Sequence, residues 1–376
     1  MPRHDDEQPV TMRAPPRVWL LFGARAGDNS QVLALGELLG WPFEIRQIVF
    51  GRRLLPKPLA VRSQNLRVAG IDLRRSTPLV SPWPELVILS GREQEPVARW
   101  IRRAAGGGVR LVYMGRPWAP LDTYDLIITT PQYFLPERPN VVLNLLPLHR
   151  VTAERLASEG AIWEARLRHL PRPYTAVLLG GSSGTFTFTP AKACELAARV
   201  GALVRVHGGS LLITDSARTP AAVFGAFIAG IDAPSHVYRW GSRDAENPFF
   251  GYLALADRIV TTGESVSMLA ESCATGKPVH VFDLSDALPR SAPWHQRFVA
   301  RFGYPALRDW VGRSVGPGYM QRDIGRIQQL LVAGGRAQWL GERAPETGND
   351  HDTRVPRDTA EAVERVRALF AGERRR

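Results

Sequence analysis

The sequence predicts an α/β protein in which two Rossmann-like domains face a cleft. The first observation is length, because 376 residues exceed what one hydrophobic core usually organises and suit two domains. The second is that short apolar runs alternate with helical segments, and that this alternation begins afresh near the middle of the chain. Such a pattern is typical of two parallel sheets covered by helices on both faces.

The first half supplies a predicted N-terminal, acceptor-side domain over residues 17–170. The run RVWLLFG (17–23) predicts a buried strand, and the leucine spacing over residues 28–40 predicts the helix that follows it. EPVARWIRRAA predicts a further helix, and five more apolar runs predict strands: FEIRQIVF, ELVILSG, RLVYMG, DLIITT and NVVLNLL. The polar, proline-rich residues 1–16 predict a disordered tail.

The pattern restarts after the PRP segment at residues 171–173, which follows a predicted helix over 152–170. We therefore expect a C-terminal donor-side domain over residues 174–345. Residues 346–376 are expected to form a loop and an amphipathic C-terminal helix. The strands predicted for the second domain are YTAVLLGG, GSLLITDS, HVYRW, DRIVTT and PVHVFDL, and its helices include PAKACELAARV and TPAAVFGAFIAG.

The chain is basic, with a formal net charge of +12, and nearly all of this charge comes from arginine. Lys57, Lys192 and Lys277 are the only lysines. This preference for arginine is typical of the codon usage of GC-rich genomes, so the positive charge is not taken as a sign of nucleic-acid binding, and no nucleic-acid partner is expected. A basic surface still favours nucleotides, phosphorylated lipids or an anionic membrane face. Cys194 and Cys273 lie among small apolar residues in predicted helices and are expected to be buried free thiols.

The sequence lacks a run of about 18 apolar residues that would predict a membrane span. Its N-terminus lacks the apolar core of a signal peptide. We therefore expect a cytoplasmic protein that contacts the anionic inner membrane peripherally.

The loop after the first strand, GARAGDNSQ, is a candidate acceptor-side loop. It differs from the dinucleotide-binding pattern G-x-G-x-x-G. Asp28 has two interpretations, an N-cap of the helix or a general base that takes a proton from an acceptor hydroxyl. The other candidate residues of this loop are Gly23, Gly27, Asn29 and Gln31.

The second domain opens with a glycine- and serine-rich loop after its first strand. Its backbone N–H groups and hydroxyls could surround a diphosphate, although a plain flexible turn has the same composition. The loop also matches G-x-S-x-G, the nucleophile elbow of serine hydrolases, but the β-prone TFTFTP follows where an elbow requires a helix. The candidate residues are Gly180, Gly181, Ser182, Ser183 and Gly184.

The next loop, TDSARTP, offers Ser216, Arg218 and Thr219 at a junction between strand and helix. An arginine here can bind phosphate through two donors. The alternative is a surface arginine beside a threonine that caps the helix.

The stretch TTGESVSMLAESCATGKPVHVF (261–282) has the most specific combination of residues. Gly263 frees the backbone, and Ser265 or Ser267 would cap a helix and could also donate to a phosphate. Glu271 lies one turn beyond Ser267 on the same face, where a carboxylate can accept two ribose hydroxyls. Gly-Lys-Pro ends the helix and is not a P-loop, because the required earlier glycine is missing.

This stretch is similar to the C-terminal domain of GT-B glycosyltransferases, including the enzyme that adds N-acetylglucosamine to peptidoglycan precursors. That resemblance implies a ribose contact at Glu271 and phosphate contacts at Gly263, Ser265 and Ser267. Over nearly the whole chain, FGARAGDNSQ, LLGGSSGTF, ITDSARTP and NPFFGYLALADRIVTTGESVSMLAESCATGKPV resemble the mitochondrial-fission "elongated mitochondria" family. Its bacterial members are described as glycosyltransferases, and its plant member as a recruiter of a dynamin-related fission protein.

These observations predict a glycosyltransferase that moves a sugar from a nucleotide-sugar to a lipid-linked or lipopolysaccharide-type acceptor of the cell envelope. We expect no cofactor beyond the nucleotide-sugar co-substrate and no bound metal, because amides, hydroxyls and Arg218 would stabilise the leaving diphosphate. Two alternatives stay open, a non-catalytic GT-B-fold scaffold and a GT-B-type sugar-nucleotide epimerase. The sequence excludes an epimerase of the short-chain type, since no lysine has a tyrosine four residues before it.

Overall fold

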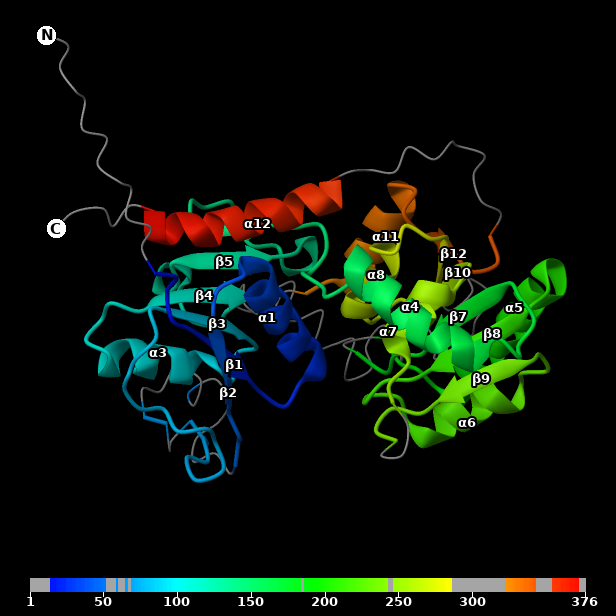
Figure 1. Cartoon of the computed structure of the whole chain (residues 1–376), viewed down its shortest axis with the longest axis horizontal. Coiled ribbons are helices and arrows are strands. Elements are labelled where there is room, and N and C mark those ends of the chain that lie inside the picture. The colour runs from blue at the N-terminus through cyan, green and yellow to red at the C-terminus, as the bar shows by residue number, and fades with distance from the viewer. Residues whose placement is uncertain are drawn as a thin grey trace, which may run out of the picture.

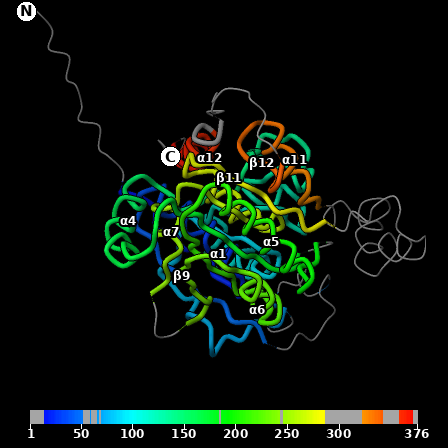
Figure 2. The backbone as a smooth tube through the Cα atoms, turned by 90° about the vertical axis from the view of Figure 1, so that its right-hand side faces the viewer, coloured from blue at the N-terminus to red at the C-terminus, as the bar shows by residue number. Residues whose placement is uncertain are grey.

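The computed structural model describes residues 14–51, 59, 65–66, 69–183, 186–242, 246–285, 322–342 and 354–371. Within these ranges the chain forms two six-stranded sheets, and all of their strand pairs are parallel. Each sheet belongs to one unit, and the two units lie side by side along the long axis (Figure 1). Viewed along that axis, one unit lies behind the other (Figure 2). The predicted α/β class with two Rossmann-like units is confirmed.

The first sheet has the strand order β2-β1-β3-β4-β5-β6. Its central strands are buried on both faces, as expected where helices cover a parallel sheet. Every strand predicted in the first half is present. The elements are β1 (Val18–Phe22), α1 (Ala26–Leu39), β2 (Phe43–Gln47), β3 (Leu86–Ser90), α3 (Glu95–Ala104), β4 (Arg110–Met114), η1 (Leu121–Thr123), β5 (Leu126–Thr129), η2 (Pro131–Tyr133) and β6 (Val141–Leu143).

The second sheet has the strand order β12-β11-β10-β7-β8-β9. Its two-residue strand β12 was not predicted, because so short a segment carries no periodicity. The elements are α4 (Ala153–Leu167), β7 (Tyr174–Leu178), α5 (Pro190–His207), β8 (Ser210–Thr214), α6 (Ala221–Ala229), β9 (Ser235–Tyr238), α7 (Phe249–Leu255), β10 (Arg258–Thr262), α8 (Val266–Cys273), β11 (Val279–Phe282), α11 (Ile324–Ala333) and β12 (Gln338–Trp339).

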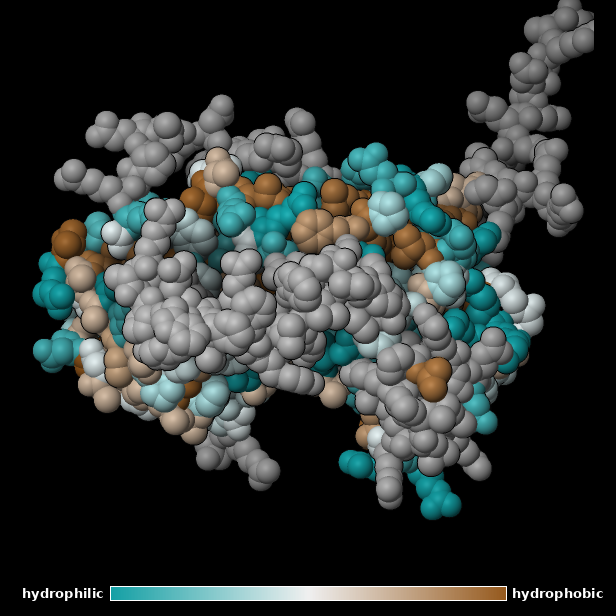
Figure 3. Space-filling model, turned by 180° about the vertical axis from the view of Figure 1, so that it is seen from behind, coloured by the Kyte–Doolittle hydropathy of each residue, from teal (hydrophilic) through white to brown (hydrophobic). Residues whose placement is uncertain are grey.

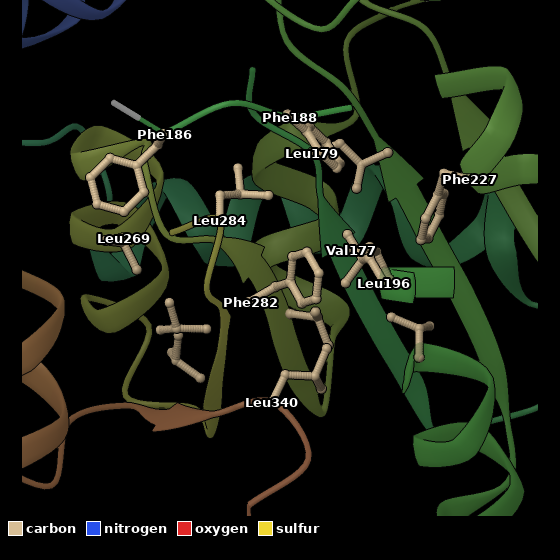
Figure 4. Packing of buried hydrophobic residues seen from close by; sticks show 14 of the residues in the cluster. Val177, Leu179, Phe186, Phe188, Leu196, Phe227, Leu269, Phe282, Leu284 and Leu340 are labelled. Atoms are coloured by element: carbon tan, nitrogen blue, oxygen red, sulfur yellow. The ribbon is translucent and has the colours of Figure 1, made fainter. Parts of the chain in front are cut away.

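The core of the second unit lies between its sheet and the helices on one face. Val177 of β7 and Phe282 of β11 point into it together with Leu196 of α5, Phe227 of α6 and Leu340 (Figure 4). These side chains are at most 2% exposed, so removing one to alanine would cost about 2–5 kcal/mol. This packing fixes the strand ends on which the candidate site is built.

Helix α4 joins the units and packs against α7 of the second unit. A Cβ added at Gly251 of α7 would stand 2.2 Å from the Trp163 ring of α4, so glycine is required for this close approach. Trp163 also lies in a hydrophobic cluster with Tyr174 and Tyr252. The hydrophobic packing of α4 therefore falls on the second unit, although Arg155 of α4 pairs with Glu37 of the first unit at 3.5 Å. The sequence had grouped residues up to 170 with the first unit.

The C-terminal helix α12 (Arg354–Ala371) returns to the first unit, where it lies along the sheet (Figure 1). Ala362, Val363 and Val366 join the hydrophobic cluster that contains Leu35 of α1. The Asp358 carboxylate accepts a hydrogen bond from the Leu145 amide at 2.7 Å. The first unit is thus built from both ends of the described chain.

None of the described helices combines the length and apolar character needed to cross a bilayer. Among the coloured residues of the face in Figure 3, hydrophobic and hydrophilic residues lie side by side. Both cysteines are free thiols, as expected, but Cys194 is exposed and only Cys273 is partly buried. The expectation of burial was wrong for Cys194, because the small neighbours that suggested it leave that part of α5 open to solvent.

Candidate functional site

The candidate site lies where the first turns of α1 and α8 meet, one from each unit. Helix α1 follows β1 and helix α8 follows β10, so both N-termini stand at the carboxyl ends of central strands. A Cβ added at Gly27 of α1 would lie 3.4 Å from the Ser267 hydroxyl of α8. Figure 1 shows both helices on the inner sides of their units. Two positive helix ends directed at one region favour an anionic ligand.

The loop before α1 is held by side chains that the sequence had assigned to the acceptor side. Asn29 accepts from the Gly23 amide at 2.8 Å and donates to the Gly23 carbonyl at 2.9 Å. A Cβ added at Gly23 would stand 2.5 Å from the Gln94 amide nitrogen. Gly23 and Asn29 therefore shape the loop, and Gln31 lies half-buried further along α1. Contact of these residues with an acceptor stays a prediction.

Asp28 lies inside the first turn of α1 rather than at its N-cap. The helix begins at Ala26, and Arg25 occupies the N-cap position without a side-chain cap hydrogen bond. The N-cap interpretation of Asp28 was therefore wrong. Burial raises the pKa of Asp28, while the charges of Arg25 and Arg322 and a hydrogen bond with Ser90 oppose the rise. A raised pKa makes the Asp28 carboxylate a stronger proton acceptor, which favours a role as general base.

The glycine loop after β7 already uses its amides within the protein. The Gly180 amide donates to the Thr262 hydroxyl at 2.8 Å, and the Gly181 amide donates to Glu264 Oε1 at 2.7 Å. Ser183 forms a β-bridge with Phe186. The predicted nest of available amides is therefore incorrect for Gly180 and Gly181, since local side chains satisfy both. Gly184 lies outside the described residues.

A nucleophile elbow is not formed at Ser182. Helix α5 begins only at Pro190, whereas an elbow serine must lead directly into a helix. The Ser182 hydroxyl instead accepts from the Phe188 amide at 3.0 Å. The structure therefore agrees with the sequence-based argument against a serine hydrolase.

Glu264 is a site residue that the sequence-based search did not select. It directly follows Gly263, and its side chain is 0% exposed. Burial raises the pKa of Glu264 to about 7, and the nearby Arg218 charge opposes that rise. A Cβ added at Gly180 would stand 1.9 Å from Glu264 Oε1, so only glycine fits beside this carboxyl. Sequence reasoning missed Glu264 because an acidic residue before a helix usually indicates a solvent-exposed first turn.

Arg218 lies between the glycine loop and Glu264. One guanidinium nitrogen donates to the Ser182 carbonyl at 3.2 Å, and the other lies 3.4 Å from Glu264 Oε1. Its side chain is 44% exposed, so it also faces solvent. The position suits a phosphate contact, which stays a prediction for Arg218.

Thr219 and Ser216 connect two loops instead of capping a helix. The Thr219 hydroxyl lies 2.6 Å from the Gly180 carbonyl and accepts from the Ser216 amide at 3.0 Å. Helix α6 begins at Ala221 with Pro220 at its N-cap, so the cap interpretation of Thr219 was wrong. These bonds hold the β8–α6 loop against the glycine loop.

The first turns of α8 contain the residues predicted to contact phosphate and ribose. Ser265 occupies the N-cap position and is buried, but its side chain makes no cap hydrogen bond. Glu271, two turns into α8, is 8% exposed. Burial raises the pKa of Glu271 to about 8, opposed by the charge of Arg150. A Cβ at Gly263 would stand 2.5 Å from the Gln328 amide nitrogen, which explains the need for glycine there.

The Gly-Lys-Pro segment after α8 has a structural role. The Lys277 ammonium donates to the carbonyls of Leu253 and Ala254 at 2.7 and 2.5 Å. These carbonyls end helix α7, where a positive charge also complements the helix dipole. Gly276 has φ of +70°, the left-handed conformation that lets the chain turn towards β11.

Trp240 presents an aromatic ring at the same edge of the second sheet. It follows β9, its ring is partly exposed, and its amide donates to the buried Asp215 carboxylate at 2.5 Å. Asp215 also pairs with Arg239 at 3.0 Å. Phe249 and Phe250 of α7 pack against each other, and Arg155 of α4 lies over the Phe250 ring. Within the described ranges, no group of three or more His, Cys, Asp or Glu side chains is arranged to hold a metal ion.

The two parallel six-stranded sheets, with helix N-termini that meet between the units, define the class of protein: an α/β protein of two Rossmann-like units. The solved glycosyltransferase SnogD from Streptomyces nogalater is similar, with a TM-score of 0.45 and 15% identity, over 95% of this chain and 100% of that chain.

The chain belongs to the family described as Mitochondrial fission ELM1, which it matches over residues 26–313. It is 30% identical to the mitochondrial fission protein ELM1 of Arabidopsis thaliana over 222 residues, which are 53% of this chain and 51% of the plant protein. The alignment thus spans about half of that relative. An uncharacterized protein of Rickettsia prowazekii (strain Madrid E), RP120, is 22% identical over 303 residues, covering 70% of this chain and 82% of the relative.

Proposed function

We propose that this protein is a glycosyltransferase that binds a nucleotide-sugar at the carboxyl edge of the second sheet. The sugar would pass to a lipid-linked or lipopolysaccharide-type acceptor held by the first unit at the anionic inner membrane face. The observation that carries the proposal is the approach of Gly27 to Ser267, which directs two helix N-termini at one region. Arg218 adds a partly exposed positive charge at the neighbouring loop. A leaving diphosphate would be stabilised by these charges.

The nucleotide would use the buried Glu271 and the exposed Trp240. A carboxylate one turn beyond Ser267 can accept the two hydroxyls of a ribose, which would compensate its burial. The Trp240 ring offers a surface on which an aromatic base can stack. The Trp240 backbone is already fixed by Asp215, so little conformational freedom of the backbone would be lost on binding.

Asp28 would act as the base if the transfer inverts the anomeric centre. The acceptor oxygen forms a bond to the anomeric carbon as its proton passes to Asp28. The bond from that carbon to the diphosphate oxygen breaks, and the electron pair leaves with the nucleoside diphosphate. Burial raises the pKa of Asp28, which makes its carboxylate a better acceptor of this proton.

The test is a calorimetric titration of the purified protein with UDP, GDP, CMP and ADP, repeated with Glu271→Ala. We expect saturable binding of one nucleotide and a loss of at least about tenfold in affinity in the variant. Glu195→Ala on α5 is the control, because Glu195 is exposed and its ion pair among the described residues is with Arg199 of the same helix. Transfer of a labelled sugar to an envelope extract then identifies the acceptor. Absence of binding by the folded protein would contradict the proposal.

Family membership favours one alternative, a non-catalytic scaffold that recruits a partner protein. This alternative predicts that Glu271→Ala leaves the cellular phenotype unchanged, since no nucleotide would be used. A sugar-nucleotide epimerase is the third candidate. It predicts that the nucleotide-sugar alone is converted, without any acceptor.

A further inference from the structure

Glu264 is buried behind Arg218 with incomplete hydrogen bonding. Its Oε1 atom accepts from the Gly181 amide at 2.7 Å and lies 3.4 Å from an Arg218 guanidinium nitrogen. Its Oε2 atom is buried, and no described residue hydrogen-bonds to it. At an N···O distance of 3.4 Å, the attraction to Arg218 does not fully offset the free-energy cost of removing the Glu264 carboxylate from water.

We propose that Glu264 is a positioning residue whose charge state sets how strongly Arg218 binds an anionic ligand. The proposal rests on the proposed phosphate contact of Arg218 and adds a residue to it. Glu264 holds one side of the guanidinium, and the Ser182 carbonyl holds the other at 3.2 Å. These two contacts orient Arg218 and leave the exposed part of its side chain for a ligand. Glu264 itself is fully buried and does not touch that ligand.

The charge of the carboxyl determines how much of the Arg218 charge remains for a ligand. When Glu264 is ionised, it neutralises the guanidinium from behind and repels an incoming phosphate. When it is protonated, the positive charge of Arg218 is uncompensated and attracts the phosphate more strongly. Since burial raises the pKa of Glu264 to about 7, this change falls near neutral pH.

The other described groups around Glu264 are uncharged, apart from Arg218. The β7 loop contributes the uncharged Gly180 and Gly181, and β10 contributes the Thr262 hydroxyl. Among the described residues, Arg218 is the charged side chain that acts on the carboxyl. The titration of Glu264 is therefore set by its burial, by these uncharged hydrogen-bond donors and by the charge of Arg218.

The experiment measures the dissociation constant of pyrophosphate between pH 6 and 9 for the wild type, Glu264→Gln and Arg218→Gln. Glutamine keeps the shape of Glu264 without its charge. We expect the wild-type Kd to rise relative to that of Glu264→Gln by up to about tenfold per pH unit above the titration of Glu264, the limit for one linked proton. Taking this ratio removes the titration of pyrophosphate itself and of other carboxyls. Arg218→Gln should bind more weakly, with a flatter profile.

Parallel profiles for wild type and Glu264→Gln would overturn the inference and leave the proposed function standing. Lack of pyrophosphate binding by every variant would also overturn it, whereas the nucleotide titration with Glu271→Ala judges the proposed function separately. If Glu264→Gln fails to fold, the pH dependence of pyrophosphate binding by Arg218→Gln tests the inference in its place. An unchanged pH dependence in that variant, whose altered side chain is partly exposed, would exclude Arg218 as the group that Glu264 controls.

Discussion

Gly27 of α1 and Ser267 of α8 are 240 positions apart in sequence and belong to different units, yet a Cβ at Gly27 would lie only 3.4 Å from the Ser267 hydroxyl. That distance is an ordinary van der Waals contact, so alanine fits but a longer side chain must enter the space between the helix ends. This space is the region into which both helix N-termini point. The pair therefore offers a way to block the candidate site without altering any polar group.

Gly27→Leu should abolish nucleotide binding while the protein stays folded. Its side chain would fill the space beside Ser267, whereas Gly27→Ala, which adds a single methyl group at contact distance, should bind nearly as well as the wild type. Calorimetry measures the affinity, and circular dichroism checks the fold. Equal affinity in the leucine variant would place the ligand elsewhere.

Asp28→Asn should slow sugar transfer by about 10²–10⁴-fold without changing donor affinity, because the amide cannot take up the acceptor proton. Initial rates with a labelled donor and calorimetric Kd values separate the two effects. Glu44→Gln on the edge strand β2 is the control, since its exposed carboxylate pairs with the neighbouring Arg46 and lies away from the candidate site. If Asp28→Asn retains the full rate, Asp28 is not the base.

Gly181→Ala should destabilise the second unit by about 1–3 kcal/mol, because its Cβ would stand 2.3 Å from the Arg218 carbonyl oxygen and force the two loops apart. Gly225→Ala is a matched control on helix α6, where nothing lies within 4 Å of the added methyl group. That substitution should stabilise by about 0.4–1 kcal/mol. Urea denaturation of both variants measures the difference, and similar stabilities would show that the glycine loop tolerates a side chain.

The stability of the protein should fall as pH rises from 5 to 8, in part because of Glu271. Its folded-state pKa of about 8 lies above the ordinary value of 4.5, so the folded state keeps a proton that the unfolded state has released. Glu271→Gln carries no such proton, and its melting temperature should decline less over this range. Each kcal/mol regained at pH 8 corresponds to about 2–4 °C.

Exposed Glu195→Gln on α5 should follow the wild-type curve and serves as the reference for that experiment. Identical slopes in wild type and Glu271→Gln would mean that Glu271 is ionised in the folded protein. Glu264 contributes to the same downward trend, so the slope in Glu271→Gln should be reduced but not eliminated.

Most strands could be predicted from the sequence, because buried parallel strands appear as short apolar runs such as Leu86–Ser90 and Tyr174–Leu178. The start of α1 was misplaced by two residues. Asp28 looks like a cap in the sequence, but in the structure it lies inside the first turn and hydrogen-bonds with Ser90 of β3. Helix boundaries of this kind depend on neighbours that are distant in sequence.

The candidate site was predictable in its loops but not in its internal bonding. Gly180 and Gly181 were selected as backbone N–H donors and Gly263 for backbone freedom. The structure instead shows the close approach of Glu264, Arg218 and Gln328, respectively, as the reason for glycine. Such contacts join the ends of strands that are far apart in the sequence, so no local sequence pattern predicts them. The packing of α12 on α1 could not be predicted either, because an amphipathic pattern shows which face of a helix is buried but not which element covers it.

The return of α12 to the first unit has a consequence for synthesis on the ribosome. Ala362 and Val366 complete a hydrophobic cluster with residues such as Leu35, which is translated more than 300 residues earlier. The first unit to emerge must therefore wait, with part of its apolar surface uncovered, while the whole second unit is made. Nascent chains halted before α12 should expose that surface to chaperones. The helix that is synthesised last thus covers the apolar surface of the unit that is synthesised first.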